Sequence, residues 1–237
     1  MEDMYYDSRF WLDVNDRRNI WYFDYFAAKN ILGFLQCFAA VAYMPECAQC
    51  NPAEIQAPTE YFCRENVFQI DNSLKSLTDY FENDVCFSSE DANMLTSDLH
   101  MLMNVLPYLN ERHYRLSGNK YENYRGEKYC IFEEMRCLDR ALARRIAPVL
   151  REFSQCSQFP PAYFTRMYSY PDAAPFMQKE YEPGDEWRKT LDIMADAWEW
   201  LAAREDISIQ GKWETVPDKV YYGLHLFAEY LPEMQND

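Results

Sequence analysis

Apolar residues recur along much of the chain at alternating spacings of three and four positions, the period of one face of an α-helix. Each stretch with this spacing predicts an amphipathic helix. The apolar positions of the five clearest stretches are Cys63, Val67, Ile70, Leu74, Leu77 and Phe81; Leu95, Leu99, Leu102, Leu106 and Leu109; Ile131, Met135, Leu138, Leu142, Ile146, Leu150 and Phe153; Trp187, Leu191, Met194, Trp198 and Leu201; and Val220, Leu224, Phe227 and Leu231. A sixth helix, more evenly apolar, is expected over residues 17–44.

Residues that favour helix starts precede three of these stretches. Ser88 and Asp91 have the spacing of a capping box, in which each side chain accepts a hydrogen bond from the backbone N–H of the other residue. Asp185 is the expected N-cap of the fourth stretch. Thr215, followed by Pro217, is expected to begin the fifth.

Proline and glycine usage refines the fold class. Pro107 and Pro148 fall inside helical patterns, so kinks or breaks are predicted there. The chain of 237 residues has only six glycines, which argues against β folds that need many tight turns. We therefore expect one all-α domain over residues 1–237, an irregular bundle of about six to nine bent helices.

The apolar pattern is interrupted between Phe153 and Asp185, where the chain holds five of its twelve prolines and seven aromatic residues. Such a segment is too aromatic for a disordered linker, so we expect irregular chain packed across the helical body. Presentation to a partner is the alternative. The matching subdivision is a helical body (1–155), a Pro/Tyr-rich segment (156–185) and C-terminal helices (186–237).

The chain is strongly acidic, with 39 acidic and 23 basic residues and a formal charge of -16. This charge repels nucleic-acid phosphate and anionic membranes but attracts basic proteins. Residues 112–151 are the exception, with 10 basic and 5 acidic residues. We expect this basic segment to pack internally, where it lowers the repulsion between its acidic neighbours. The alternative for the net charge as a whole is that it only maintains solubility.

Features of secreted and membrane proteins are not apparent. The N-terminal stretch MEDMYYDSRFW has no basic region followed by an apolar run, and the longest apolar stretch, Ile31–Met44, has 14 residues. A membrane span needs about 20. We therefore expect a cytoplasmic protein, with no membrane binding and with its eight cysteines as reduced thiols. Disulfides are the alternative if an export signal has been removed.

Cys47 and Cys50, in the stretch MPECAQCNP, have the spacing of half a zinc site. A structural zinc site usually adds a second such pair, whereas the nearest other cysteines, Cys37 and Cys63, are single. A redox pair would need a strand–helix setting that this sequence lacks. We interpret the stretch as a loop with thiols. A zinc-stabilised structural protein that uses all four cysteines is a weaker alternative.

Motifs of the common enzyme classes are missing from the sequence. His100, His113 and His225 are isolated, without the paired spacing of a zinc hydrolase or a di-iron bundle. Glycine-rich nucleotide loops and the Gly-x-Ser-x-Gly nucleophile motif are absent as well. We therefore expect a protein that is not an enzyme and needs no cofactor.

Asp192, Asp196 and Glu199 share one face of the fourth stretch, opposite Trp198. Carboxylates at this spacing can hold Mg²⁺, as in all-α isoprenoid synthases, but those sites need a second acidic cluster. An enzyme or small-ligand binder with a metal or diphosphate pocket around Asp192 and Asp196 is therefore the alternative function. The plain alternative is a solvated polar helix face.

The same face predicts a surface for a basic partner, because its carboxylates recur at every helical turn beside an aromatic residue. Its expected residues are Glu180, Glu182, Asp185, Asp192, Asp196, Glu199 and Trp200. Our main expectation is a non-enzymatic protein that neutralises a basic partner without binding nucleic acid itself. Two classes fit: an immunity protein against a bacterial toxin, and a phage-type inhibitor of a nucleic-acid-handling defence enzyme.

Overall fold

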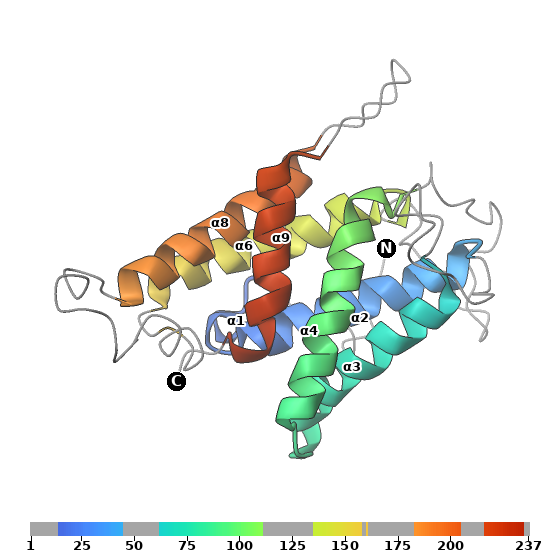
Figure 1. Cartoon of the computed structure of the whole chain (residues 1–237), viewed down its shortest axis with the longest axis horizontal. Coiled ribbons are helices and arrows are strands. Elements are labelled where there is room, and N and C mark those ends of the chain that lie inside the picture. Colours follow the sequence, from blue (N-terminus) through green and yellow to red (C-terminus); the bar gives the residue numbers. More distant parts are fainter. Residues whose placement is uncertain are drawn as a thin grey trace, which may run out of the picture.

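A computed structural model of the protein describes residues 14–44, 62–110, 135–157, 160, 183–204 and 216–234. These ranges form α-helices and short 3₁₀ helices, and no strand (Figure 1). The elements are α1 (Arg18–Trp21), α2 (Phe23–Val41), α3 (Arg64–Asn83), α4 (Ser89–Val105), η3 (Leu106–Tyr108), α6 (Leu138–Cys156), α8 (Pro183–Ala203), α9 (Asp218–Tyr230) and η4 (Leu231–Glu233). The all-α class is therefore confirmed for the described part of the chain.

The six long helices that the structure describes form a closed ring of contacts. Along this ring α2 packs on α3, α3 on α4, α4 on α9, α9 on α8, and α8 on α6, which returns to α2. Figure 1 shows α6 and α8 side by side over much of their length, and α3 and α4 meeting at one corner of the molecule. Helices that are distant in sequence, such as α4 and α9, thereby become neighbours.

The predicted apolar faces point into one common core. Helix α2 is buried on most of its surface, as its even hydrophobicity predicts, and Phe23, Phe26, Ile31 and Phe38 are fully buried. The Phe23 ring contacts Phe26 of its own helix, Phe153 of α6 and Phe227 of α9, with centroid distances of 6.2, 5.2 and 6.2 Å. Aromatic packing therefore joins three of the helices at the centre of the bundle.

Helix α4 begins as predicted, whereas α8 does not. The N–H of Asp91 donates to Ser88 Oγ at 3.2 Å, and the N–H of Ser88 donates to Asp91 Oδ2 at 2.8 Å, which completes the capping box. The prediction of Asp185 as an N-cap is wrong, because α8 begins at Pro183 and Asp185 lies in its first turn. A proline fits the first helical position, since its φ is already helical and it needs no N–H partner there.

The prolines act differently in the helices that contain or border them. Helix α4 ends at Val105 and Pro107 lies in the 3₁₀ turn η3, so the predicted break occurs. Helix α6 continues from Leu138 to Cys156 through Pro148 without a break. Pro217 is the N-cap of α9, whereas Thr215 lies outside the described residues.

Helices α8 and α9 approach each other closely at a glycine. A Cβ atom added to Gly223 would lie 2.6 Å from both the Ala197 Cβ and the Ile193 carbonyl oxygen. These distances are far below van der Waals contact. Glycine at position 223 therefore sets how tightly the two helices can pack.

Two further predictions concern the Pro/Tyr-rich segment and membrane-spanning helices. Most of the Pro/Tyr-rich segment, including residues 161–182, lies outside the described residues, so its packing stays a prediction. Among the helices that the structure does describe, none is both long enough and apolar enough to cross a membrane.

Candidate functional site

Three of the predicted partner-binding carboxylates on α8 converge on one arginine of α6. Arg151 Nη1 lies 3.0 Å from Asp192 Oδ1, and Arg151 Nη2 lies 2.5 Å from Asp196 Oδ1. The Glu199 carboxylate accepts two hydrogen bonds, from Nε at 2.8 Å and from Nη2 at 2.9 Å. The spacing along α8 aligns the carboxylates, and the packing of α6 against α8 supplies the cation.

This carboxylate cluster, defined as Asp192, Asp196 and Glu199 around Arg151, keeps a formal charge of -2. The three acidic side chains are 50, 74 and 49% exposed, in that order, whereas Arg151 is 27% exposed. The hydrogen bonds to Glu199, and then those to Asp196, raise the pKa of the Arg151 guanidinium although burial opposes the shift. Arg151 therefore stays charged and holds an acidic surface in a fixed arrangement.

The remaining predicted residues lie apart from this cluster. Asp185 is exposed, and its carboxylate lies 3.7 Å from Arg188 of the same helix. Trp200 packs against the core and is only partly exposed, with the Arg204 guanidinium 5.6 Å from its ring centroid. Glu180 and Glu182 lie outside the described residues.

Three arginines of α6, the described helix of the basic segment, contact other parts of the fold. Besides Arg151, Arg145 Nε donates to Asn30 Oδ1 of α2 at 2.7 Å, and Arg140 Nη1 donates to the Arg204 carbonyl at 3.2 Å. Helix α6 therefore places positive charge beside the acidic side chains of α8. Arg144 of the same helix is exposed and residues 112–134 lie outside the described residues, so the internal packing of the whole basic segment stays a prediction.

A histidine pair joins α4 to α9. The Nδ1 atoms of His100 and His225 lie 2.7 Å apart, and the rings stack with a centroid distance of 4.9 Å and an interplanar angle of 24°. His100 Nε2 is 3.2 Å from Glu229 Oε2, and His225 Nε2 is 3.0 Å from Asn104 Oδ1. Each ring nitrogen of the pair therefore has a polar partner.

Burial, with a smaller contribution from the charge on His100, lowers the pKa of His225. The sequence pattern does not indicate this pair, because 125 residues separate the two histidines. A weak signal was available, since each histidine is followed four positions later by a polar residue on the same helix face, Asn104 and Glu229.

The thiol prediction remains untested. Cys47 and Cys50 lie outside the described residues, so the interpretation of this stretch as a loop with thiols stays a prediction. The Cys63 thiol donates a hydrogen bond to Asn66 Oδ1 at 3.0 Å, beside the start of α3. Within the described ranges, no group of three or more histidine, cysteine or acidic side chains is arranged to hold a metal ion.

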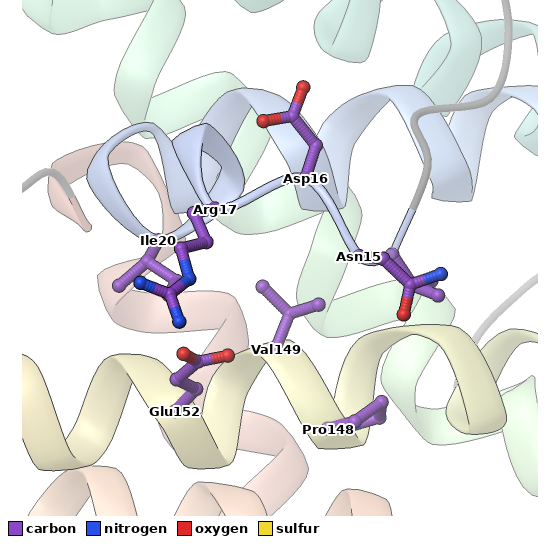
Figure 2. A pocket seen from close by; sticks show the side chains of 8 residues that line it. Asn15, Asp16, Arg17, Ile20, Pro148, Val149 and Glu152 are labelled. Carbon is purple, nitrogen blue, oxygen red and sulfur yellow. The ribbon is translucent and has the colours of Figure 1, made fainter.

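A surface pocket of about 340 Å³ lies between the start of the described chain and α6 (Figure 2). Its lining residues are Val14, Asn15, Asp16, Arg17, Ile20, Pro148, Val149 and Glu152. Figure 2 shows the Arg17 and Glu152 side chains on the same side of the pocket, while Asp16 points away from both. Asp192 and Asp196 do not line this pocket, so it is not the acidic pocket expected of the alternative enzyme.

Comparisons of the chain with protein-family models, with curated proteins and with solved structures found no match.

Proposed function

We propose that this is a non-enzymatic binding protein that neutralises a basic partner protein. The observation that carries the proposal is the carboxylate cluster, in which three exposed acidic side chains are held by a single arginine. The overall charge of -16 adds a long-range attraction that would accelerate the encounter with a basic surface.

The ion pairs with Arg151 support binding as well as folding. Because Arg151 fixes Asp192, Asp196 and Glu199, these side chains lose little further freedom when a partner binds. Carboxylate oxygens have several lone pairs, so each group can accept hydrogen bonds from a partner while it remains bound to Arg151. The cluster therefore offers an ordered acidic surface to arginine or lysine side chains.

Two classes of basic partner fit this chemistry. Toxins and defence enzymes that act on nucleic acids carry basic surfaces for phosphate, which an acidic protein can occupy. We therefore propose either an immunity protein against a bacterial toxin or a phage-type inhibitor of such a defence enzyme. We also propose that it acts in the cytoplasm, where thiols stay reduced, because Cys37, Cys63 and Cys137 are thiols rather than disulfides.

The direct test is capture of partners from the native host by the full chain, followed by mass spectrometry. We expect one stoichiometric basic protein at about 50 mM NaCl and weaker retention at about 500 mM, since salt screens the attraction. Recovery of no stoichiometric basic protein would reject the proposed function.

The position of the surface is tested with a charge reversal at Asp196, the most exposed member of the cluster. Asp196→Arg should slow association with the captured partner, and the effect should diminish as salt rises. Glu233→Arg is a matched control, because it makes the same change of net charge at an exposed residue after α9. Equal slowing by both variants would show that net charge, rather than the carboxylate cluster, directs binding.

A further inference from the structure

A second acidic region lies where α3 and α4 meet (Figure 1). Residues 76–110 contain no lysine or arginine. Their six acidic residues are Asp79, Glu82, Asp84, Glu90, Asp91 and Asp98. On α8, by comparison, ion pairs with Arg188, Lys189 and Arg151 offset much of the negative charge.

Three of these acidic residues stand at the end of α3 where negative charge is unfavourable. Asp79 and Glu82 are near the last turn, and Asp84 is the C-cap. The last turn of α3 holds no basic residue, although the exposed carbonyls at a helix C-terminus favour positive charge. Lys29 of α2 already pairs with Glu82, and a cation from outside the chain would act in the same way on Asp79 and Asp84.

Aromatic rings form a connected surface beside the same corner. Phe81 contacts Tyr22 of the α1–α2 junction at a centroid distance of 5.9 Å and Tyr80 at 5.0 Å. Tyr80 continues the contacts to Phe87 at 6.3 Å. Tyr22 and Tyr80 remain 52 and 41% exposed, so the ring surface is open on its outer side. Exposed aromatic clusters of this kind are typical of interaction sites.

A lysine inside the protein already uses the combination of ring and carboxylate. Lys29 is buried, forms an ion pair with Glu82, and lies 5.8 Å from the centroid of the Tyr25 ring. Tyr25 also donates a hydrogen bond to Glu82 at 2.6 Å. Asp84 and Glu90 are exposed and follow Tyr80 and Phe87 by four and three positions, so these carboxylates could receive a partner's cation in the same way.

We propose that this corner surface, defined as Tyr22, Tyr80, Phe87, Asp79, Asp84 and Glu90, binds an arginine-rich segment of the basic partner. The proposal rests on the proposed function and assigns the anchoring contacts to a different place from the α8 cluster. Arginine fits better than lysine, because its planar guanidinium stacks on aromatic rings and donates paired hydrogen bonds to carboxylates. The rings supply contact area, and the carboxylates select the positive charge.

The test uses a fluorescent octa-arginine peptide, with octa-lysine as the comparison, and measures binding to the full chain by anisotropy. We expect Tyr80→Ala to weaken octa-arginine binding about fivefold. Asp84→Asn/Glu90→Gln should weaken it by about the same factor at low salt and by less at high salt. Asparagine is chosen for position 84 because Asp84 has a φ of 51°, which asparagine tolerates.

The controls are Tyr222→Ala, at an exposed tyrosine of α9, and Glu233→Gln, at an exposed acidic residue after α9, both of which should leave octa-arginine binding within about twofold of wild type. Unchanged binding by the corner variants, or equal loss in the controls, would overturn the assignment. Octa-lysine binding as tight as that of octa-arginine would overturn the preference for arginine.

Capture of the host partner distinguishes the corner-surface proposal from the proposed function on which it rests. If the wild-type chain captures a basic protein and Tyr80→Ala captures it equally well, the corner assignment fails while the proposed function stands. If the wild-type chain captures no basic protein, the proposed function fails whatever the peptides show.

Discussion

His100 of α4 and His225 of α9 face each other through Nδ1 atoms only 2.7 Å apart. A single proton between the two Nδ1 atoms forms one hydrogen bond, in which one ring donates and the other accepts. This is possible because a neutral imidazole donates with one nitrogen and accepts with the other. Two protonated rings would instead place two donors against each other. The contact between α4 and α9 therefore favours at least one neutral histidine.

The first prediction is that the protein loses stability as the pH falls through the range in which His225 would ordinarily gain a proton. Its pKa in the folded protein lies below the ordinary value of 6.5, so below that pH the unfolded chain binds the proton first. The stabilisation is complete above 6.5 and is lost as the pH falls below it. Urea unfolding from about pH 7.5 to about pH 5.5 measures this slope.

The control for this prediction is His225→Gln, which keeps a polar side chain but cannot gain a proton. The groups that face the pair, Glu229 beside His100 and Asn104 beside His225, are unchanged in this variant. The variant should show a flatter dependence of unfolding free energy on pH. An unchanged slope would assign the pH dependence to other groups.

The second prediction concerns Arg151. Replacement by methionine leaves three neighbouring carboxylates without their cation, and we expect a loss of about 1 kcal/mol of unfolding free energy. The value is modest because each carboxylate is about half exposed or more. The loss should be smaller in high salt, which screens the carboxylate repulsion. Arg144→Met, at an exposed arginine of the same helix, should cost less than about half as much. Equal losses would mean that the ion pairs of the carboxylate cluster add no stability of their own.

The third prediction is that Gly223→Ala separates α8 from α9. Its added methyl group would lie 2.6 Å from the Ile193 carbonyl oxygen and from Ala197 Cβ, so the helices must move apart. We expect a loss of about 2 kcal/mol or more in urea unfolding. Tyr222→Ala, at the exposed neighbouring residue, should change stability by less than about 0.5 kcal/mol. A stable Gly223→Ala variant would show that this interface is loosely packed.

The fourth prediction tests the capping box of α4. Ser88→Ala removes the hydroxyl that accepts the Asp91 N–H, and we expect the unfolding free energy to fall by about 1 kcal/mol. Ser89→Ala changes the next, exposed serine, which is inside the helix, and should be nearly neutral. Thermal and urea unfolding of the pair compare the two sites directly, and similar losses in both variants would contradict the cap.

The sequence predicted local features where the responsible interactions lie within one or two helical turns. Leu95, Leu99 and Leu102 are all buried, as their spacing indicates, and Ser88 caps the helix as its neighbours indicate. Phe81 has the same spacing as the buried residues of α3 but is only partly buried. Periodicity identifies a helix face, but it does not show which part of that face the neighbouring helices cover.

The sequence alone determined the helical class, the apolar faces and the carboxylate face of α8, because backbone hydrogen bonds and side-chain spacing within a helix are local. Only the tertiary structure decided that Arg151 stands among Asp192, Asp196 and Glu199, and that His100 meets His225. Those contacts depend on which helices become neighbours and in what register they pack. The packing of the whole core sets both, and no short stretch of sequence encodes them.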